Sequence, residues 1–497
     1  MYDLEVVAEE FNTFFVNVGP DLAGQIPNPT PSDPTPESFV KDNLTSMFLT
    51  AVDEAEVIEV VQNCENKTST DCDGIDMTVL KKVIDGISKP LAYIVNSSFQ
   101  TGIFPDRMKI AKVIPLYKAN NKHHFTNYRP VSLLSQFSKI LEKLFNKRLD
   151  LFIEKNTLLS HSQYGFRSQR STSLALLELI EGITTYLDKK LHVLGIFIDL
   201  KKAFDTINHT ILANKLEKYG IRGTVLQWVR NYLNNRRQFV KMGDTSSSCL
   251  DITCGVPQGS VLGPKLFLLY INDIVNVSDL FKFVLFADDT NILYAGDNLE
   301  DLLEGVSTEL LKLKKWFNLN KLSLNVNKTK LILFGENTED TQINIQLDGA
   351  NIERVQEIKF LGTIIDEKIS WKPHVKYIHS KLSKSTAVMN KAKYFLDHIS
   401  LKILYHALIS PYLNNGAEVW GNTYKTTIDP LVKIQKRAIR IIHKVGFLEH
   451  THELFLQSKI LKFTYLVKFK TGQILFNPCV LIRIFYRAKR WLCLIIS

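Results

Sequence analysis

The sequence is poor in cysteine. Six cysteines occur in 497 residues, and none forms a Cys-x-x-Cys pair or lies near a histidine at the spacing of a zinc site. At this density, neither a disulfide framework nor a zinc module is the basis of the fold. We therefore expect a reducing, intracellular setting.

The sequence also lacks a secretory signal and a long apolar run. Its first residues, Met-Tyr-Asp-Leu-Glu, contain no basic region followed by an apolar core. The most apolar stretch near the C-terminus is interrupted by Arg483, Arg487, Lys489 and Arg490, so we expect no membrane span and no membrane partner. With 45% apolar residues, a chain of this length forms large cores, and we expect about three structural units.

Basic residues are scarce at the N-terminus and abundant in two later segments. Residues 1–60 contain twelve Asp or Glu and one Lys, whereas residues 101–170 contain thirteen Lys or Arg and four acids. Residues 371–445 contain thirteen Lys or Arg and three acids. Two basic segments favour a polyanionic partner such as nucleic acid, although solvated helix faces have a similar composition.

The most informative stretch is residues 283–294, where Asp288 and Asp289 lie between two apolar, β-prone runs. The runs predict two strands, and the acids predict the tight turn between them. Such a turn is often an ordinary solvated one. Two carboxylates at a hairpin tip repel each other unless a cation neutralises them, so in this context the turn indicates metal binding.

A third aspartate follows another apolar run. Residues 192–198 are typical of a central strand, and Asp199 stands where the chain turns into a helix that we expect to continue through Leu216. The order strand, helix, helix, strand pair, helix, strand predicts an α+β, ferredoxin-like sheet with Asp199 beside the hairpin. Three carboxylates there suit two Mg²⁺ ions, with Mn²⁺ as the alternative, for nucleotidyl transfer or phosphodiester hydrolysis.

Two loops add to this pattern. Residues 255–260, Gly-Val-Pro-Gln-Gly-Ser, form a glycine loop whose backbone can approach a ligand closely. Residues 163–172 place Arg167 and Arg170 before a helix N-terminus, which favours a phosphate group there. The alternative is a basic capping loop without a ligand.

Together these motifs resemble a known family. Residues 197–205, 255–260 and 286–289 resemble motifs A, B and C of reverse transcriptases in order and approximate spacing. The neighbouring pieces, residues 128–132, 164–167 and 360–362, resemble the polymerase of jockey-like, non-long-terminal-repeat retrotransposons. This resemblance covers about residues 50–445. It implies an RNA-directed DNA polymerase with a right-hand fold of fingers, ferredoxin-like palm and helical thumb.

The resemblance also implies roles for individual residues. Asp199, Asp288 and Asp289 become the catalytic, metal-binding carboxylates, with Asp289 the least direct ligand. Phe204 excludes a ribose 2′-hydroxyl, unless it is simply a core residue. The other residues expected at the nucleotide are Lys118, Arg129, Arg167, Gln258, Gly259 and Lys328, of which Lys328 could equally be a solvated loop lysine; Leu361 and Gly362 are the expected primer grip. The implied partners are an RNA template, a DNA primer and deoxynucleoside triphosphates, and the implied location is the nucleus, for which we find no clear targeting signal.

We expect six regions along the chain. They are an acidic connector with a proline-rich linker (1–52), a helical N-terminal extension (53–98), fingers (99–189), a catalytic palm (190–368), a helical thumb (369–445) and a C-terminal segment that is cut short (446–497). Complete elements of this type usually begin with an endonuclease, and the residues before Pro36 are too few for one. The alternative to an active enzyme is therefore a catalytically idle nucleic-acid-binding remnant of a truncated element.

Overall fold

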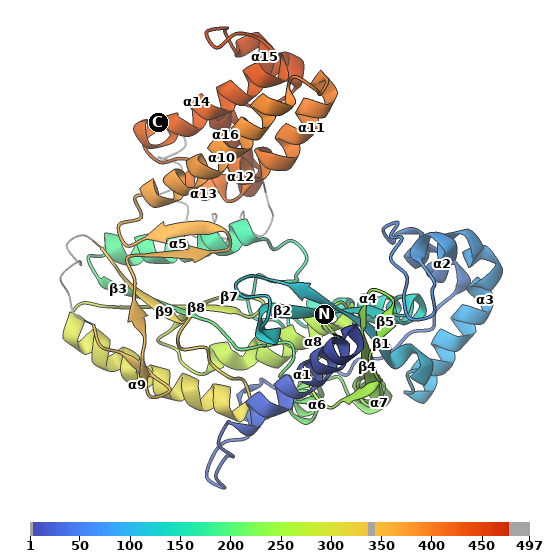
Figure 1. Cartoon of the computed structure of the whole chain (residues 1–497). Helices are drawn as coiled ribbons and strands as arrows, with labels where there is room; N and C mark the ends of the chain where they lie inside the picture. The colour runs from blue at the N-terminus through green and yellow to red at the C-terminus, as the bar shows by residue number, and fades with distance from the viewer. Residues whose placement is uncertain (1–2, 336–342, 477–497) are drawn as a thin grey trace.

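The computed structural model describes residues 3–335 and 343–476. Within those residues, two five-stranded sheets lie in the body of the molecule, and a separate group of helices stands above them (Figure 1). Two short pairs, β10 (Gln346–Leu347) with β11 (Ala350–Asn351) and β13 (Glu357–Phe360) with β14 (Thr363–Asp366), complete the strands. The 3-10 helices are η1 (Pro36–Phe39), η2 (Asp106–Lys109), η3 (Phe125–Asn127) and η4 (Asn272–Asn276).

The central sheet has the strand order β12-β9-β3-β8-β7. Its strands are β12 (Glu353–Arg354), β9 (Lys330–Phe334), β3 (His192–Ile198), β8 (Asp289–Gly296) and β7 (Lys282–Phe286). The middle strand, β3, pairs antiparallel with both β8 and β9 and is buried at every residue after His192. Burial on both faces explains why β3 reads in the sequence as a continuous apolar run.

Helices cover both faces of the central sheet. Val193 and Phe197 share a core with α5 (Thr172–Asp188), whereas Leu194 and Ile196 share the largest core with α9 (Leu299–Leu319). Figure 1 shows α5 above the sheet and α9 below it. The alternation along β3 is the ordinary period of a strand with a helix layer on each side.

The second sheet combines strands from distant parts of the chain. Its members are β2 (Tyr128–Leu134), β1 (Ile110–Tyr117), β4 (Arg236–Met242), β5 (Thr245–Ser246) and β6 (Leu250–Ile252). β1 pairs antiparallel with β2 and parallel with β4. The sheet therefore takes strands from both the range expected to form fingers and the range expected to form the palm.

Helices also fill the space between and beside the sheets. They are α1 (Leu4–Gly24), α2 (Glu54–Gln62), α3 (Met77–Thr101), α4 (Gln136–Lys155), α6 (His209–Lys218), α7 (Gly223–Leu233) and α8 (Leu262–Ile271). Trp228 of α7 stacks on Phe145 of α4 with the ring centroids 4.1 Å apart. The body also contains a fully buried ion pair, in which Lys215 Nζ is 2.6 Å from Asp273 Oδ1.

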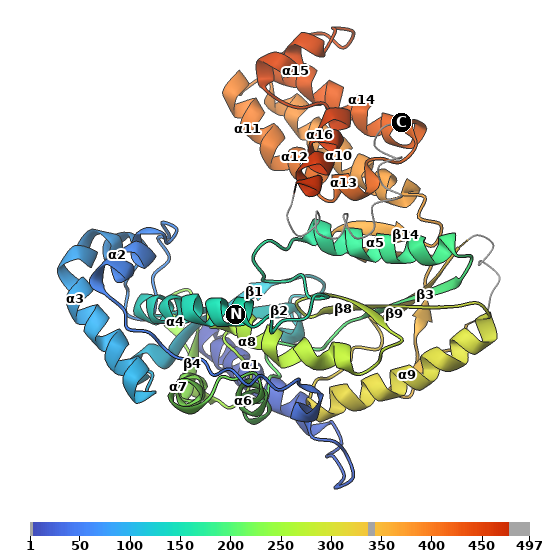
Figure 2. The same cartoon turned by 180° about the vertical axis from the view of Figure 1, so that it is seen from behind.

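The C-terminal helices form a unit of their own above α5 and β14, as both views show (Figures 1 and 2). They are α10 (Lys372–Ala392), α11 (His398–Leu408), α12 (Ser410–Asn414), α13 (Ala417–Trp420), α14 (Lys425–Ile442), α15 (His452–Ser458) and α16 (Phe463–Leu475). Trp420 stacks on Phe463 at 5.2 Å. The helical unit thus continues beyond residue 445, where the sequence analysis ends the thumb; residues 477–497 of the expected C-terminal segment lie outside the described residues.

One helix of the body begins later than the sequence predicts. The helix expected directly after Asp199 begins only at His209, because the Asn208 side chain caps it by accepting from the N–H groups of Thr210 and Ile211. The residues between form turns.

The cysteines in the described part of the chain, Cys64, Cys72, Cys249 and Cys254, are free thiols. In that same part we find no helix whose length and apolar character would let it cross a membrane.

Candidate active site

Three aspartates meet at one end of the central sheet. Asp199 directly follows β3, Asp288 lies in the turn after β7, and Asp289 begins β8. Ile198 pairs with Thr290 across β3 and β8, so Asp199 and Asp289 are adjacent positions on neighbouring strands. β7 and β8 form the antiparallel hairpin that the sequence predicts.

The three carboxylates influence one another. The partial burial of the turn, then the charges of Asp288 and Asp199, raise the pKa of Asp289 to about 6. Burial is also the main cause that raises the pKa of Asp288, and Asp199 adds to it. Since Asp289 remains an exposed residue, solvent screens part of its repulsion.

The donor set fits a hard divalent cation. All three side chains offer carboxylate oxygens, the ligands that Mg²⁺ and Mn²⁺ prefer. In the described ranges, no three His, Cys, Asp or Glu side chains come close enough to form a ready metal cage. Repulsion between like charges favours such a separation, and the charge of Asp199 nonetheless contributes to the raised pKa of both Asp288 and Asp289.

The loop before β9 holds Asp199 in place. The backbone N–H of Asn325 donates to the carbonyl oxygen of Asp199 at 2.9 Å, and Asn325 Nδ2 donates to Asp199 Oδ2 at 2.7 Å. Lys328 Nζ lies 3.7 Å from the same carboxylate oxygen. Lys328 was expected here from the sequence and Asn325 was not; the available signal was an asparagine three residues before that lysine in a loop entering a strand.

Three basic residues face the carboxylates. Tyr117 and Tyr128 pair at the ends of β1 and β2, which brings Lys118 and Arg129 to the same edge. Burial lowers the pKa of Lys118, the charges of Arg129 and Lys328 lower it further, and Asp199 and Asp288 oppose the change. These couplings bring Lys118, Arg129 and Lys328, all expected from the sequence, into one electrostatic environment with the acids.

Lys202 is a fourth basic residue here, and the sequence analysis did not single it out. Its Nζ donates to the carbonyl oxygen of Tyr128 at 3.2 Å. Burial lowers its pKa; among the smaller effects Asp205 opposes this, and Lys118, Arg129 and Lys328 add to it. The only signal in the sequence was its place three residues after Asp199, in the segment between β3 and α6.

Phe204 lies between two aromatic rings. Its ring stacks on Phe267 of α8 at 4.6 Å and meets the edge-on ring of Phe166 at 6.5 Å. The side chain is half-buried, so one part packs in the core while another part stays accessible. Both expectations for Phe204, core residue and pocket wall, are compatible with this position.

The glycine loop is bound to the turn that carries Phe204. The N–H of Val256 donates to the carbonyl oxygen of Phe204 at 2.9 Å, and Gln258 Nε2 donates to Asp205 Oδ1 at 2.8 Å. Gly259 has a φ of +134°, and a β-carbon there would overlap the carbonyl oxygen of Ser132. Only glycine fits this position without a shift of backbone.

The loop containing Arg167 supports the acidic turn. Gln163 Oε1 accepts from the N–H of Gly165 at 2.8 Å and from that of Ala287 at 3.0 Å. Arg167 Nη1 donates to the carbonyl oxygens of Ser160 and Gln163 at 2.6 and 3.3 Å. Arg167 therefore stabilises its own loop, and its approach to a triphosphate stays a prediction.

Leu361 and Gly362 form the turn of the β13–β14 hairpin, with φ values of +46° and +87°. Asn415 Nδ2 donates to the carbonyl oxygen of Leu361 at 3.3 Å. This turn thus contacts the segment between α12 and α13, and the neighbouring Phe360 ring lies 6.2 Å from that of Phe197 in β3. The role of Leu361 and Gly362 as primer grip stays a prediction.

The middle of the chain matches a known protein family. Residues 118–365 match the family "Reverse transcriptase (RNA-dependent DNA polymerase)". The chain is 27% identical over 406 residues to the probable RNA-directed DNA polymerase from transposon BS of Drosophila melanogaster, covering 78% of this chain and 44% of that protein. It is 27% identical over 453 residues to the RNA-directed DNA polymerase from mobile element jockey of the same species, covering 87% and 49%.

The match concerns part of those relatives, because this chain spans less than half of their length. Within that part, the match includes all three aspartates and both basic residues at the β1–β2 edge. The chain belongs to the reverse transcriptase family, and the relatives that it resembles are named as RNA-directed DNA polymerases of transposon BS and of the mobile element jockey.

Proposed function

We propose that this chain copies an RNA template into DNA by adding deoxynucleotides to a DNA primer. The observation that carries the proposal is the meeting of Asp199, Asp288 and Asp289 at one sheet end, opposite Lys118 and Arg129. Nucleotidyl transfer requires carboxylates that bind cations next to basic side chains that bind phosphate groups. The nucleus is the proposed place of action.

Asp199 and Asp288, with Asp289 as the less direct ligand, would hold two Mg²⁺ ions, or Mn²⁺ in their place. Such ions, when bound, activate the 3′-hydroxyl of the primer and stabilise the leaving pyrophosphate. Lys118 and Arg129 would neutralise the triphosphate. The Lys118 ammonium would act as a point charge, and the planar Arg129 guanidinium would donate two parallel hydrogen bonds.

The remaining residues have proposed roles in selection and release. Phe204 would leave no room for a ribose 2′-hydroxyl, and Gln258 and Gly259 would lie against the templating base pair. Lys328, which lies beside Asp199, would give a proton to the departing pyrophosphate. Arg167 would contribute through the loop that supports the acidic turn.

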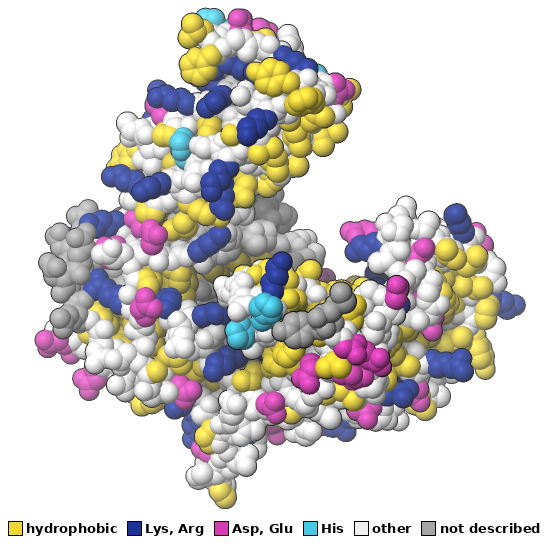
Figure 3. Space-filling model, viewed as in Figure 1, with side chains coloured by type: hydrophobic (Ala, Val, Ile, Leu, Met, Phe, Trp, Pro, Cys, Tyr) yellow, Lys and Arg dark blue, Asp and Glu magenta, His cyan; other side chains and the backbone are white. Residues whose placement is uncertain are grey.

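We further propose a right-hand arrangement. The central sheet would be the palm, the sheet containing β1, β2 and β4 would belong to the fingers, and the C-terminal helices would be the thumb, with Leu361 and Gly362 as primer grip. Lys and Arg side chains are spread over the C-terminal helices and continue on the body below them (Figure 3). This distribution supports a template and primer lying between the two parts.

Primer extension tests the proposal. Purified protein, an RNA template with a DNA primer, deoxynucleotides and Mg²⁺ should give extended DNA, and Asp288→Asn should abolish extension while retaining primer–template binding. Asp297→Asn is the matched control, because Asp297 is an exposed aspartate just beyond the opposite end of β8. A wild-type protein that binds the primer–template without extending it would instead support the idle remnant.

A further inference from the structure

The N-terminal helix α1 packs against the turn that carries Phe204 and Asp205. A β-carbon on Gly19 would overlap the carbonyl oxygen of Asp205 and lie 2.5 Å from Cys254 Sγ. That Sγ in turn donates to the same carbonyl oxygen at 3.3 Å. The absence of a side chain at Gly19 therefore lets helix backbone touch the junction between residues 197–205 and the glycine loop.

Hydrogen bonds and rings fix α1 in this position. The buried side chain of Asn12 donates to the carbonyl oxygen of Ser248 at 2.9 Å and accepts from Gln238 Nε2 at 3.1 Å. The ring of Phe11 meets that of Tyr128 edge-on at 4.9 Å. The Nζ of Lys202 lies 5.7 Å from the centroid of the Phe14 ring, at cation–π distance.

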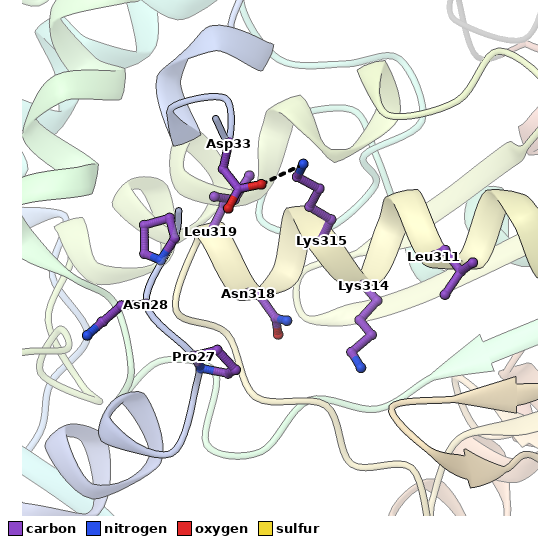
Figure 4. Close-up of a pocket in the computed structure, with 9 residues that line it drawn as sticks. Pro27, Asn28, Asp33, Leu311, Lys314, Lys315, Asn318 and Leu319 are labelled. Atoms are coloured by element: carbon purple, nitrogen blue, oxygen red, sulfur yellow. Dashed lines mark ion pairs between the residues drawn. The ribbon is translucent and has the colours of Figure 1, made fainter. Parts of the chain in front are cut away.

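The end of α1 and the chain after it are attached to the loop before β9 and to α9. Ser323 Oγ donates to the carbonyl oxygen of Leu22 at 3.3 Å, and the carbonyl oxygen of Ser323 accepts from the N–H of Lys201. Farther along, Asp33 forms an ion pair of 2.6 Å with Lys315 of α9, shown in Figure 4. Residues 3–33 thus cross the body from β4 to α9 and pass the turn that carries Phe204 and Asp205 on the way.

Asp205, whose carbonyl oxygen α1 contacts through Gly19, also binds the glycine loop through its side chain. Asp205 Oδ1 accepts from Gln258 Nε2, while Asp205 Oδ2 is buried with no partner among the described residues. A carboxylate only accepts hydrogen bonds, so this contact turns the NH₂ group of Gln258 toward Asp205 and its carbonyl oxygen elsewhere. Burial, opposed by the Gln258 hydrogen bond, raises the pKa of Asp205 to about 6.

We propose that α1 is a positioning element of the nucleotide pocket: through Gly19 it holds Asp205 against Gln258, and so sets the spacing between Gln258 and Phe204. The inference rests on the proposed polymerase function for its kinetic consequence. Phe204 and Asp205 are neighbours in one turn, and the N–H of Val256 is bonded to Phe204. A shift of the backbone at Asp205 therefore moves both Phe204 and Gln258, the two residues proposed to line the pocket.

The test compares two alanine variants of the full chain. Gly19→Ala introduces the overlap described above, whereas Gly24→Ala, at the end of the same helix, places its β-carbon where no atom lies within 4 Å. Both replacements raise helix propensity alike, so a difference between them reports the contact at Gly19. Melting curves verify that both variants fold.

Two readouts are measured. The first is alkylation of Cys254 by iodoacetamide in the native protein, followed by mass spectrometry with the exposed Cys249 as internal reference. The second is the ratio of kcat/KM for a deoxynucleotide to that for the matching ribonucleotide. We expect Gly19→Ala to speed Cys254 alkylation and to lower the ratio by roughly 10- to 100-fold, since displacements of about 1 Å in positioning groups can cost about 10²-fold. Gly24→Ala should change neither.

Equal values for the two variants in both measurements would overturn the inference, as would an equal loss with both sugars at an unchanged Cys254 rate. If the wild type extends no primer, the proposed function fails, and the Cys254 rates still decide whether α1 holds this turn. If Gly19→Ala does not fold, the isosteric Asp205→Asn tests the link from the other side. It should lower the sugar ratio in a folded protein, and an unchanged ratio would contradict the inference.

Discussion

The side-chain amide of Asn325 donates to Asp199 Oδ2 at 2.7 Å, and its backbone N–H donates to the carbonyl oxygen of the same aspartate at 2.9 Å. One loop residue therefore fixes both the backbone and the carboxylate of Asp199. Groups that orient a metal ligand in this way typically change affinity or activity by about 10- to 100-fold when they are removed.

We predict that Asn325→Ala lowers primer extension by about 10- to 100-fold and raises the Mg²⁺ concentration needed for half-maximal rate. Asn325→Asp should not rescue it, because a second carboxylate would repel Asp199. Asn327→Ala is the control: its side chain is exposed in the same loop. Equal rates for Asn325→Ala and Asn327→Ala would show that Asp199 needs no such support.

Sugar selection is expected to depend on Phe204. If its ring forms the pocket wall, Phe204→Val should raise ribonucleotide incorporation relative to deoxynucleotide, a discrimination change of roughly a few kcal/mol. If Phe204 only packs against Phe267, both rates should fall together, because the smaller Val loses packing; truncation of a fully buried Phe to Ala, an upper bound for this half-buried site, costs about 3–5 kcal/mol of stability. Single-nucleotide insertion rates with both sugars, on a variant shown to be folded, separate the two outcomes.

Binding of primer–template should depend strongly on salt. Residues 101–170 and 371–445 each contain thirteen Lys or Arg, far more than their acids. If about six phosphates are contacted, affinity should fall roughly 10³-fold between about 50 and 200 mM salt. Fluorescence anisotropy with labelled primer–template at several salt concentrations measures the slope, and a flat dependence would argue against these segments as the binding surface.

Acid should destabilise the contact between the β13–β14 hairpin and the C-terminal helices through His374. Its Nδ1 accepts from the N–H of Ile364 at 3.2 Å, and its buried Nε2 has no partner among the described residues. Burial, with a smaller effect of Lys359, lowers the pKa of His374 to about 4. The folded state therefore binds fewer protons than the unfolded state, and stability is lost as pH falls from about 6.5 toward 4.

At pH 5 this single group should remove about 2 kcal/mol of unfolding free energy relative to neutral pH. His374→Asn, which keeps an acceptor but does not titrate, should lose correspondingly less between pH 7.5 and pH 5 in urea unfolding. His379→Asn, a change at an exposed histidine on the same helix, should behave as the wild type does. A His374→Asn variant with the wild-type pH dependence would mean that this histidine is not the cause.

The sequence predicted the elements whose signals are local. The run at residues 192–198 and the pair Asp288–Asp289 become β3 and the hairpin turn, because apolar burial and a tight turn leave a pattern within a few residues. The convergence of Asp199 with that turn also followed from element order. These signals sufficed to gather the three acids into one candidate site, whereas Lys118 was expected there only from the resemblance to reverse transcriptases.

Other features depend on contacts that no local pattern reveals. The acidic N-terminal residues read as a connector, yet Asn12 bonds to Gln238, 226 positions away. The role of Asn325 arises from where its loop meets Asp199, and loop asparagines are common. The late start of the helix at His209 reflects a competing cap at Asn208, which an apolar period does not register.

The alternation of the two sheets along the chain affects how the protein can fold. β1 and β2 precede β3, whereas β4, the parallel partner of β1, follows it, and β8 comes later still. Neither sheet is complete until the other has been partly laid down, so no single cut yields two fragments that each contain a whole sheet. During synthesis, the strands of the first hairpin must wait more than a hundred residues for β4, and closure of such long loops is slow. We therefore expect the end of the central sheet that carries Asp199, Asp288 and Asp289 to form late in folding.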